Sequence, residues 1–252
     1  MTLPQTNLQL FLAMQEAGYD NTSLETVHVA YDAAKMLFGS CFRSCGKPFV
    51  CHLVGTAGTL AIWEQPVEML NAGLLHSAYL FGNFADGEKG PTQRRRYWLR
   101  NLVGEKTEDL IYRYTIASWS KEPTTQLYTR VAADRGCREI FTVKMADLHD
   151  ELADGSILVT PNKHCPFGVL QDEAKEQDLL SVIRTAVSEK ASNQFANTLK
   201  TLRDNVGLPA GIVSQRKSFY HINPGIDDLR RSRFTQRLVK LRSSITKRTR
   251  AA

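Results

Sequence analysis

Two histidines and one aspartate, far apart along the chain, are the residues best suited to chemistry. His52 opens the run His-Leu-Val-Gly-Thr-Ala, His76 ends an apolar run and precedes Ser77, and Asp147 follows Val-Lys-Met-Ala. Neutral imidazole nitrogens and carboxylate oxygens together suit Mn, Fe, Zn or Mg. A bound ion of this kind can activate water and neutralise charge that develops on a phosphoryl group. The three residues therefore predict a metal site, provided that their segments face one cavity.

The segments that carry these residues have helical patterns. After His52, apolar residues recur at helical spacing, at Leu53, Ala57, Leu60 and Ala61. Pro66 can begin the next helix, because a proline in the first turn loses no required hydrogen bond. We expect that helix to run from Val67 to about Leu80, with His76 near its C-terminal end. Apolar periodicity over residues 127–152 predicts the helix that carries the aspartate.

Helical patterns also dominate the rest of the chain. They extend from Leu8 to near Gly18 and over about 23–37, 92–117 and 172–206, and no segment alternates long enough to predict a sheet. A chain of 252 residues with 42% apolar and 23% charged residues can bury a substantial core. We predict an all-α helical bundle over residues 1–206, followed by a linker or strap over 207–228.

The end of the chain is strongly basic. Nine of the 32 lysines and arginines lie between Arg230 and Arg250, which leaves 23 basic and 26 acidic residues, a formal charge of −3, in residues 1–229. Phe234, Leu238, Leu241 and Ile245 follow one another at gaps of four, three and four residues. This spacing predicts a basic amphipathic helical tail over 229–252 that docks on an anionic surface of a membrane, nucleic acid or protein. A solvated, disordered end is the alternative.

Composition also gives an expectation for the cellular compartment. No apolar segment approaches the roughly 20 residues that cross a bilayer, and the N-terminus lacks a basic region followed by an apolar core. The five cysteines are odd in number, and their spacing is not that of a zinc ribbon. We expect a cytoplasmic protein with reduced thiols and no transmembrane segment; its oligomeric state stays open.

Several segments resemble a known family. They are Ala30–Lys35, Phe42–His52, Ala72–His76, Val103–Glu105 and Val143–Asp147. In this order they resemble the hydrolase domain of RelA/SpoT-type guanosine polyphosphate enzymes, which belong to the HD superfamily of metal phosphohydrolases. The similarity covers about residues 27–155. It implies an HD-domain-like bundle that acts on a phosphorylated small molecule or nucleotide.

The resemblance also implies roles for individual residues. His52, His76 and Asp147 would hold a divalent ion such as Mn, Fe or Zn. Arg43 would match an arginine that packs against the nucleotide base, and Lys47 would be a second substrate contact.

The chain departs from the family at the residues that handle water. Ser77 stands where the family has a metal-binding aspartate, and Leu80 and Phe81 stand where it has a Glu-Asp pair. A hydroxyl is a weaker ligand than a carboxylate, so metal affinity should fall. General acid–base assistance of about 10²–10⁴-fold would have to come from other residues. The candidates are Tyr79 and Glu105, with His149, Asp150 and Glu151 in addition, if the fold brings them close. Ser77, the third predicted catalytic residue, would hold a metal-bound water or a substrate oxygen.

Two functions therefore stay open. The first is a divergent metal-dependent phosphohydrolase that acts on a nucleotide or small phosphate ester. The second is a catalytically inactive HD-like protein that binds a ligand or partner. Asp147 could also simply accept a bond from Lys144 on its own helix. We expect Arg94–Arg96 to be an exposed helix face, with a phosphate-binding patch as the alternative, and Tyr114 to be a core aromatic without cofactor meaning.

Overall fold

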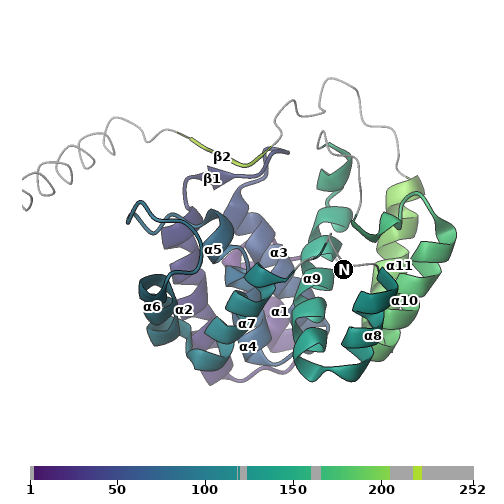
Figure 1. The fold of residues 1–252 in the computed structure, drawn as a ribbon, viewed down its shortest axis with the longest axis horizontal. Coiled ribbons are helices and arrows are strands. Elements are labelled where there is room, and N and C mark those ends of the chain that lie inside the picture. The colour runs from purple at the N-terminus through teal and green to yellow at the C-terminus, as the bar shows by residue number, and fades with distance from the viewer. Residues whose placement is uncertain (1–2, 118, 120–123, 160–165, 205–217, 223–252) are drawn as a thin grey trace, which may run out of the picture. The chain divides into compact units, whose positions relative to one another are not determined.

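Helices form nearly all of the regular structure, so the predicted all-α fold is confirmed. The computed structural model describes residues 3–117, 119, 124–159, 166–204 and 218–222. In these residues the helices pack as a bundle (Figure 1). In chain order the α-helices are α1 (Asn7–Glu16), α2 (Asn21–Phe38), α3 (Phe49–Ile62), α4 (Val67–Leu75), α5 (Ala78–Phe81), α6 (Gln93–Val103), α7 (Glu105–Ile116), α8 (Thr124–Ala133), α9 (Arg135–Ala153), α10 (Glu173–Ala186) and α11 (Glu189–Asp204). The short elements are β1 (Cys41–Phe42), β2 (Tyr220–His221) and the 3₁₀ turns η1 (Ser156–Leu158) and η2 (Pro166–Gly168).

Helix α3 lies at the centre of the bundle and packs against α1, α2, α4 and α9. Its residues are buried almost all round, which agrees with a helix that is apolar on more than one face. Small residues allow the close approach of α4: a Cβ atom added to Gly73 would lie 2.7 Å from Cδ1 of Leu60. The histidine of α3 is therefore held in a tightly packed core.

The predicted helix over 67–80 is wrong in one respect, because it is interrupted at the His-Ser dipeptide. Helix α4 ends at Leu75, His76 is its C-cap, and Ser77 leaves the helical conformation with φ −93° and ψ 3°. The His76 ring donates from Nδ1 to the Gly73 carbonyl at 2.8 Å. That carbonyl is one of the last four of the helix, which have no partner in a regular α-helix. The interruption thus fixes the orientation of the imidazole.

Helix α9 connects the two parts of the bundle. It packs against α3, α4 and α7 and also against α8, α10 and α11. Its N-cap is Asp134, whose side chain accepts from the backbone nitrogen of Cys137 at 2.7 Å. The predicted pattern over 92–117 likewise forms two helices, because Gly104 between α6 and α7 has φ 83°, a conformation that favours glycine.

The chain divides into two units, Met1–Tyr220 and His221–Ala252. The predicted basic tail over 229–252 and most of the predicted strap over 207–228 lie outside the described residues. Within the first unit, the ring of Phe219 packs on Phe81 and that of Tyr220 stacks on Phe42, with centroids 4.7 and 5.6 Å apart. Phe219 and Tyr220 of the predicted strap are therefore packed within the unit that carries the predicted metal ligands.

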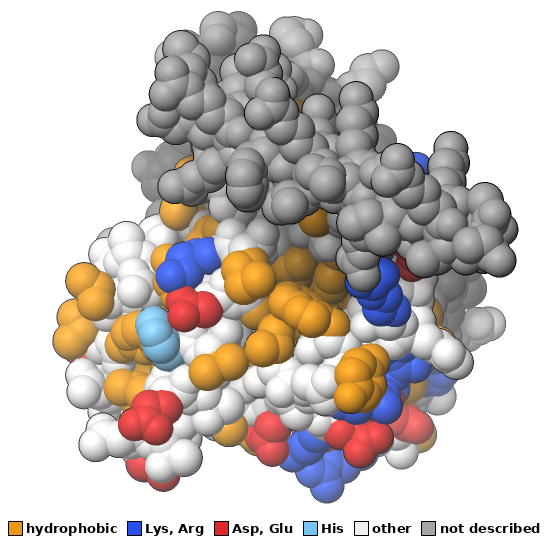
Figure 2. Space-filling view, turned by 90° about the vertical axis from the view of Figure 1, so that its left-hand side faces the viewer, with side chains coloured by type: hydrophobic (Ala, Val, Ile, Leu, Met, Phe, Trp, Pro, Cys, Tyr) orange, Lys and Arg blue, Asp and Glu red, His pale blue; other side chains and the backbone are white. Residues whose placement is uncertain are grey.

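The surface of the bundle mixes apolar and charged side chains. The side on which α2 and α6 lie in Figure 1 faces the viewer in Figure 2, where hydrophobic side chains gather beside charged ones. Met36 of α2 and Leu80 of α5 are among the exposed hydrophobic residues. None of the described helices has both the length and the apolar character needed to cross a bilayer.

Candidate metal centre

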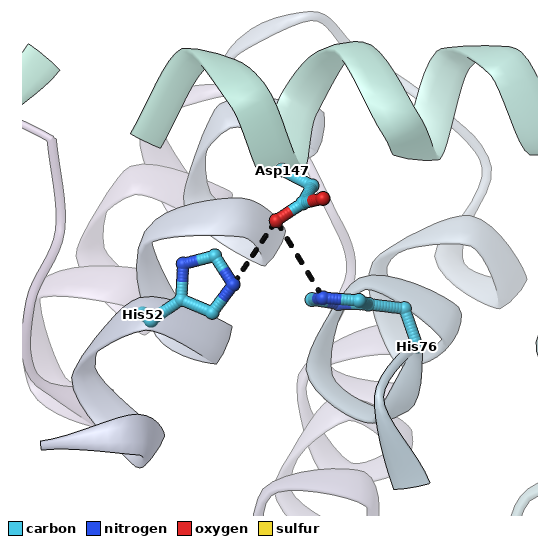
Figure 3. Close-up of side chains that lie close together, drawn as sticks. All are labelled: His52, His76 and Asp147. Atoms are coloured by element: carbon cyan, nitrogen blue, oxygen red, sulfur yellow. Dashed lines mark ion pairs between the residues drawn. The ribbon is translucent and has the colours of Figure 1, made fainter. Parts of the chain in front are cut away.

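The fold brings the three predicted metal ligands together. His52 comes from α3, His76 from the end of α4 and Asp147 from α9, and their side chains point toward one another (Figure 3). Oδ1 of Asp147 is 3.1 Å from Nε2 of His52 and 3.7 Å from Nε2 of His76. One ligand atom from each residue lies within 4.8 Å of the others, and all three residues are buried. The spatial convergence that the prediction required is therefore confirmed.

Both imidazoles are held by their other ring nitrogen. Nδ1 of His52 donates to Oδ2 of Asp150 at 2.8 Å, and Nδ1 of His76 donates to the Gly73 carbonyl at 2.8 Å. Metal-binding histidines usually make this second hydrogen bond to a carboxylate or carbonyl, because it fixes the tautomer and the ring orientation. The arrangement leaves both Nε2 atoms facing Asp147, as a metal site requires.

The two oxygens of Asp147 have different surroundings. Oδ2 accepts from the Tyr114 hydroxyl at 2.8 Å and from the Lys144 ammonium at 2.6 Å. Oδ1 faces the two histidines. One oxygen is thus occupied by protein donors, whereas the other is available to a cation beside the imidazoles.

Charge in the cluster follows from burial and from the neighbouring groups. Burial opposes ionisation of Asp147, but Lys144 and the two histidines outweigh it and hold its pKa well below the usual range. Burial lowers the pKa of His76 to about 4, so this ring is neutral near pH 7. For His52, burial and Arg43 lower the pKa, but the hydrogen bonds to Asp147 and Asp150 prevail and raise it. A cation between the carboxylates and His52 is therefore favoured, whether it is a proton or a metal ion.

The distances from the aspartate to the two histidines fit a divalent ion. Two ligands that bind one ion at about 2.0–2.2 Å are at most about 4.4 Å apart, and the two distances from Oδ1 of Asp147 meet this limit. Two imidazoles and one carboxylate suit Mn, Fe and Zn. The residues could therefore hold such an ion, while the choice among the three metals is not determined by the donor types.

The two predicted substrate contacts lie beside the cluster, and they differ in how much hydrogen-bonding capacity remains. Arg43 forms an ion pair with Glu151, and its Nη1 atom is buried without a hydrogen-bond partner. Lys47 is 2.7 Å from Oδ2 of Asp150 and 2.7 Å from Oδ2 of Asp154, so two carboxylates already neutralise it. Arg43 therefore keeps one buried donor without a partner, and Lys47 is mainly a partner of the acids around it.

The predicted catalytic residues are dispersed. Ser77 follows His76 directly and is buried, and its hydroxyl makes no capping bond to α5. The Tyr79 hydroxyl donates to Glu108 at 2.8 Å, in a separate network. Glu105 begins α7 with 79% of its side chain exposed and lies 3.8 Å from Arg100. The contacts of the described residues place neither Tyr79 nor Glu105 in the cluster, and Ser77 adjoins it only through the chain.

Asp150 and Lys144 have clearer roles than the sequence indicates. Asp150 is a candidate for proton transfer by sequence, whereas in the structure it orients His52. The sequence indicates a hydrogen bond from Lys144 to Asp147 only as an alternative to metal binding. In the structure Asp147 contacts Lys144 and the histidines at the same time. The sequence offers one indication of these roles. Lys144 and Asp150 each lie three residues from Asp147, and residues three apart share one face of a helix.

Tyr114 is buried, as predicted, and its hydroxyl also donates to Oδ2 of Asp147. The expectation of an exposed helix face at Arg94–Arg96 is wrong. Arg95 is only 4% exposed: it pairs with Asp86 and lies over the Phe84 ring at 4.6 Å. The run of three arginines is therefore not a uniformly solvated face, because a salt bridge and an aromatic ring compensate the burial of its central residue.

Comparison with known proteins adds one finding. Residues 39–118 match a family described only as a domain of unknown function (DUF6817). This segment contains His52 and His76 and ends before Asp147. No curated protein matches the chain.

Proposed function

We propose that this chain is a divergent metal-dependent phosphohydrolase of HD type that acts on a nucleotide or another small phosphate ester. The observation that carries the proposal is the buried convergence of His52, His76 and Asp147 from three helices. Three of the ligand types of HD hydrolases, in the family's order, thus meet at one point, and Ser77 stands in the place of the remaining aspartate.

The residues around the cluster support this chemistry in specific ways. When bound, the ion supplies Lewis acidity, which lowers the pKa of water and offsets charge on a phosphoryl group. Asp150 orients the His52 ring, and Lys144 and Tyr114 hold Oδ2 of Asp147. Arg43, with its unpartnered buried Nη1 atom, is the proposed contact for a substrate phosphate or base.

A second candidate function is binding without catalysis. Lys144 already places a partly buried ammonium 2.6 Å from Asp147, so part of the carboxylate's charge is neutralised without a metal. The residue after His76 is a serine and not a carboxylate. These two observations favour a ligand- or partner-binding protein that keeps the polar cluster for stability.

Metal-linked stability and turnover distinguish the two functions. An ion present at about 100 times its Kd stabilises the folded state by about 2.7 kcal/mol, which raises the melting temperature by about 5–11 °C in a protein of this size. We expect this increase with MnCl₂, FeSO₄ under anaerobic conditions, or ZnCl₂. His76→Asn should abolish it, whereas His28→Asn, a substitution of an exposed histidine on α2, should not.

Hydrolysis of p-nitrophenyl phosphate and nucleoside phosphates is then measured with the stabilising metal. Turnover that is lost in His76→Asn and retained in His28→Asn supports the phosphohydrolase. Metal binding without turnover of any of these substrates supports the second function. No stabilisation by any of the three metals would contradict the metal site itself.

A further inference from the structure

A cavity lies beside the metal cluster, and Asp150 of α9 lines it. It is bounded by α9, by α11, which packs on α9, and by the segment before α1, and it has a volume of about 780 Å³. Figure 1 shows α9 and α11 in the same half of the first unit. Small-molecule sites usually have about 300–1,000 Å³. The cavity is therefore large enough for a ligand of nucleoside size.

The polar groups of the cavity are amides, hydroxyls, carboxylates and one imidazole. Helix α11 contributes Gln194, Asn197, Thr198 and Thr201, α9 contributes His149 and Asp150, and Asp154 is the C-cap of α9. The remaining wall is largely aliphatic, and none of the described lining residues is a lysine or an arginine. Amides and hydroxyls both donate and accept hydrogen bonds. The lining therefore suits an apolar ring that carries hydroxyl or amide groups.

The charge of the cavity disfavours a phosphate. Two carboxylates, Asp150 and Asp154, face it, and one ammonium, Lys47, is within 2.7 Å of each. Lys47, and His52 where it is protonated, offset this charge from outside the lining. Among the described lining residues there is no lysine or arginine to pair with a phosphate, so a phosphate would meet carboxylates without a cationic partner.

We infer that this cavity is a second small-molecule site, which takes an uncharged nucleoside-like compound and not a phosphorylated one. It is separate from the proposed metal chemistry, since neither histidine of the cluster lines it. The two sites share Asp150, whose Oδ2 atom accepts from His52. A ligand in the cavity would therefore contact the carboxylate that orients a metal ligand.

The test uses adenosine as the probe, with the full chain in EDTA, so that failure of the metal proposal does not affect the result. At the usual ligand efficiency, a nucleoside should bind with a Kd on the order of 0.1 mM. Isothermal titration should show adenosine binding and at least about tenfold weaker binding of adenosine 5′-monophosphate.

Two tryptophan substitutions on one helix provide a matched control. Asn197 and Asn193 are both exposed on α11, one helical turn apart, but only Asn197 lines the cavity. Asn197→Trp should weaken adenosine binding at least about tenfold by filling the cavity, and Asn193→Trp should leave it unchanged. Ala153→Trp, on the opposite wall, is a second blocking variant if the first lowers the melting temperature.

The inference would be overturned by any of three results. The first is the absence of saturable adenosine binding up to about 5 mM, a concentration far above the expected Kd. The second is that the monophosphate binds as tightly as adenosine or more tightly. The third is that both blocking variants bind adenosine as well as the unchanged protein does.

Discussion

The buried ion pair between Lys144 and Asp147 allows a quantitative test of how the cluster is held. The two charged atoms are 2.6 Å apart, and the side chains are only 16% and 7% exposed. Asp147→Asn keeps the size of the side chain but leaves the Lys144 ammonium without its counter-charge. Removing one partner of a buried pair costs about 3–5 kcal/mol, because the other charge stays desolvated. We expect about 3 kcal/mol, the lower end of the range, since Lys144 retains some access to water.

The companion variants isolate the pair. Lys144→Met alone should also destabilise the protein, because it leaves the carboxylate with fewer donors. The double variant Lys144→Met/Asp147→Asn removes both charges, and we expect it to be more stable than Asp147→Asn by about 2 kcal/mol.

Urea unfolding in EDTA, followed by far-ultraviolet circular dichroism, measures all four proteins. A loss of 3 kcal/mol corresponds to a fall of about 6–12 °C in melting temperature for a protein of this size, which thermal scans should show independently. If the loss in the double variant equals the sum of the losses in the single variants, Lys144 and Asp147 are not energetically coupled. The account of how the carboxylate is held would then be refuted.

Two further predictions concern packing and pH. A Cβ atom at Gly55 would lie 1.8 Å from Oδ1 of Asp150. Gly55→Ala should therefore displace that carboxylate, lower the free energy of unfolding by about 1–3 kcal/mol and weaken metal binding about 10–100-fold. An unchanged urea midpoint and an unchanged metal affinity would contradict this. Burial opposes ionisation of Glu108, but hydrogen bonds from Arg96 and Arg100 prevail and lower its pKa below the ordinary value. As the pH falls, the unfolded chain therefore protonates Glu108 before the folded chain does. The stability that ionised Glu108 contributes above about pH 4.5 should be lost as the pH decreases further. Glu108→Gln should reduce this acid sensitivity in unfolding measured at pH 7 and pH 4, and an identical pH dependence in the variant would exclude Glu108 as a source.

Much of the fold was predictable because helical patterns are local. Apolar residues at helical spacing after His52 predict α3, and the proline at position 66 predicts the start of α4. The types of the three ligands could also be read directly, since imidazole and carboxylate groups are the usual donors to these metals. These features depend on residues within a few turns of one another.

The remaining features depend on contacts between distant segments. His52 and Asp150 form their hydrogen bond across 98 positions in the chain, and periodicity contains no information about which faces of two helices meet. The end of α4 at the His-Ser dipeptide and the burial of Arg95 likewise depend on the groups that pack there.

The chain alone therefore determined the helices and the candidate ligands, because hydrogen bonding and apolar periodicity within a helix involve near neighbours. Tertiary packing decided that His52, His76 and Asp147 meet, and which of their atoms face one another. It also decided that Asp150, Lys144 and other neighbours fix their orientation. These relations arise only when buried helices select one mutual arrangement to fill the core.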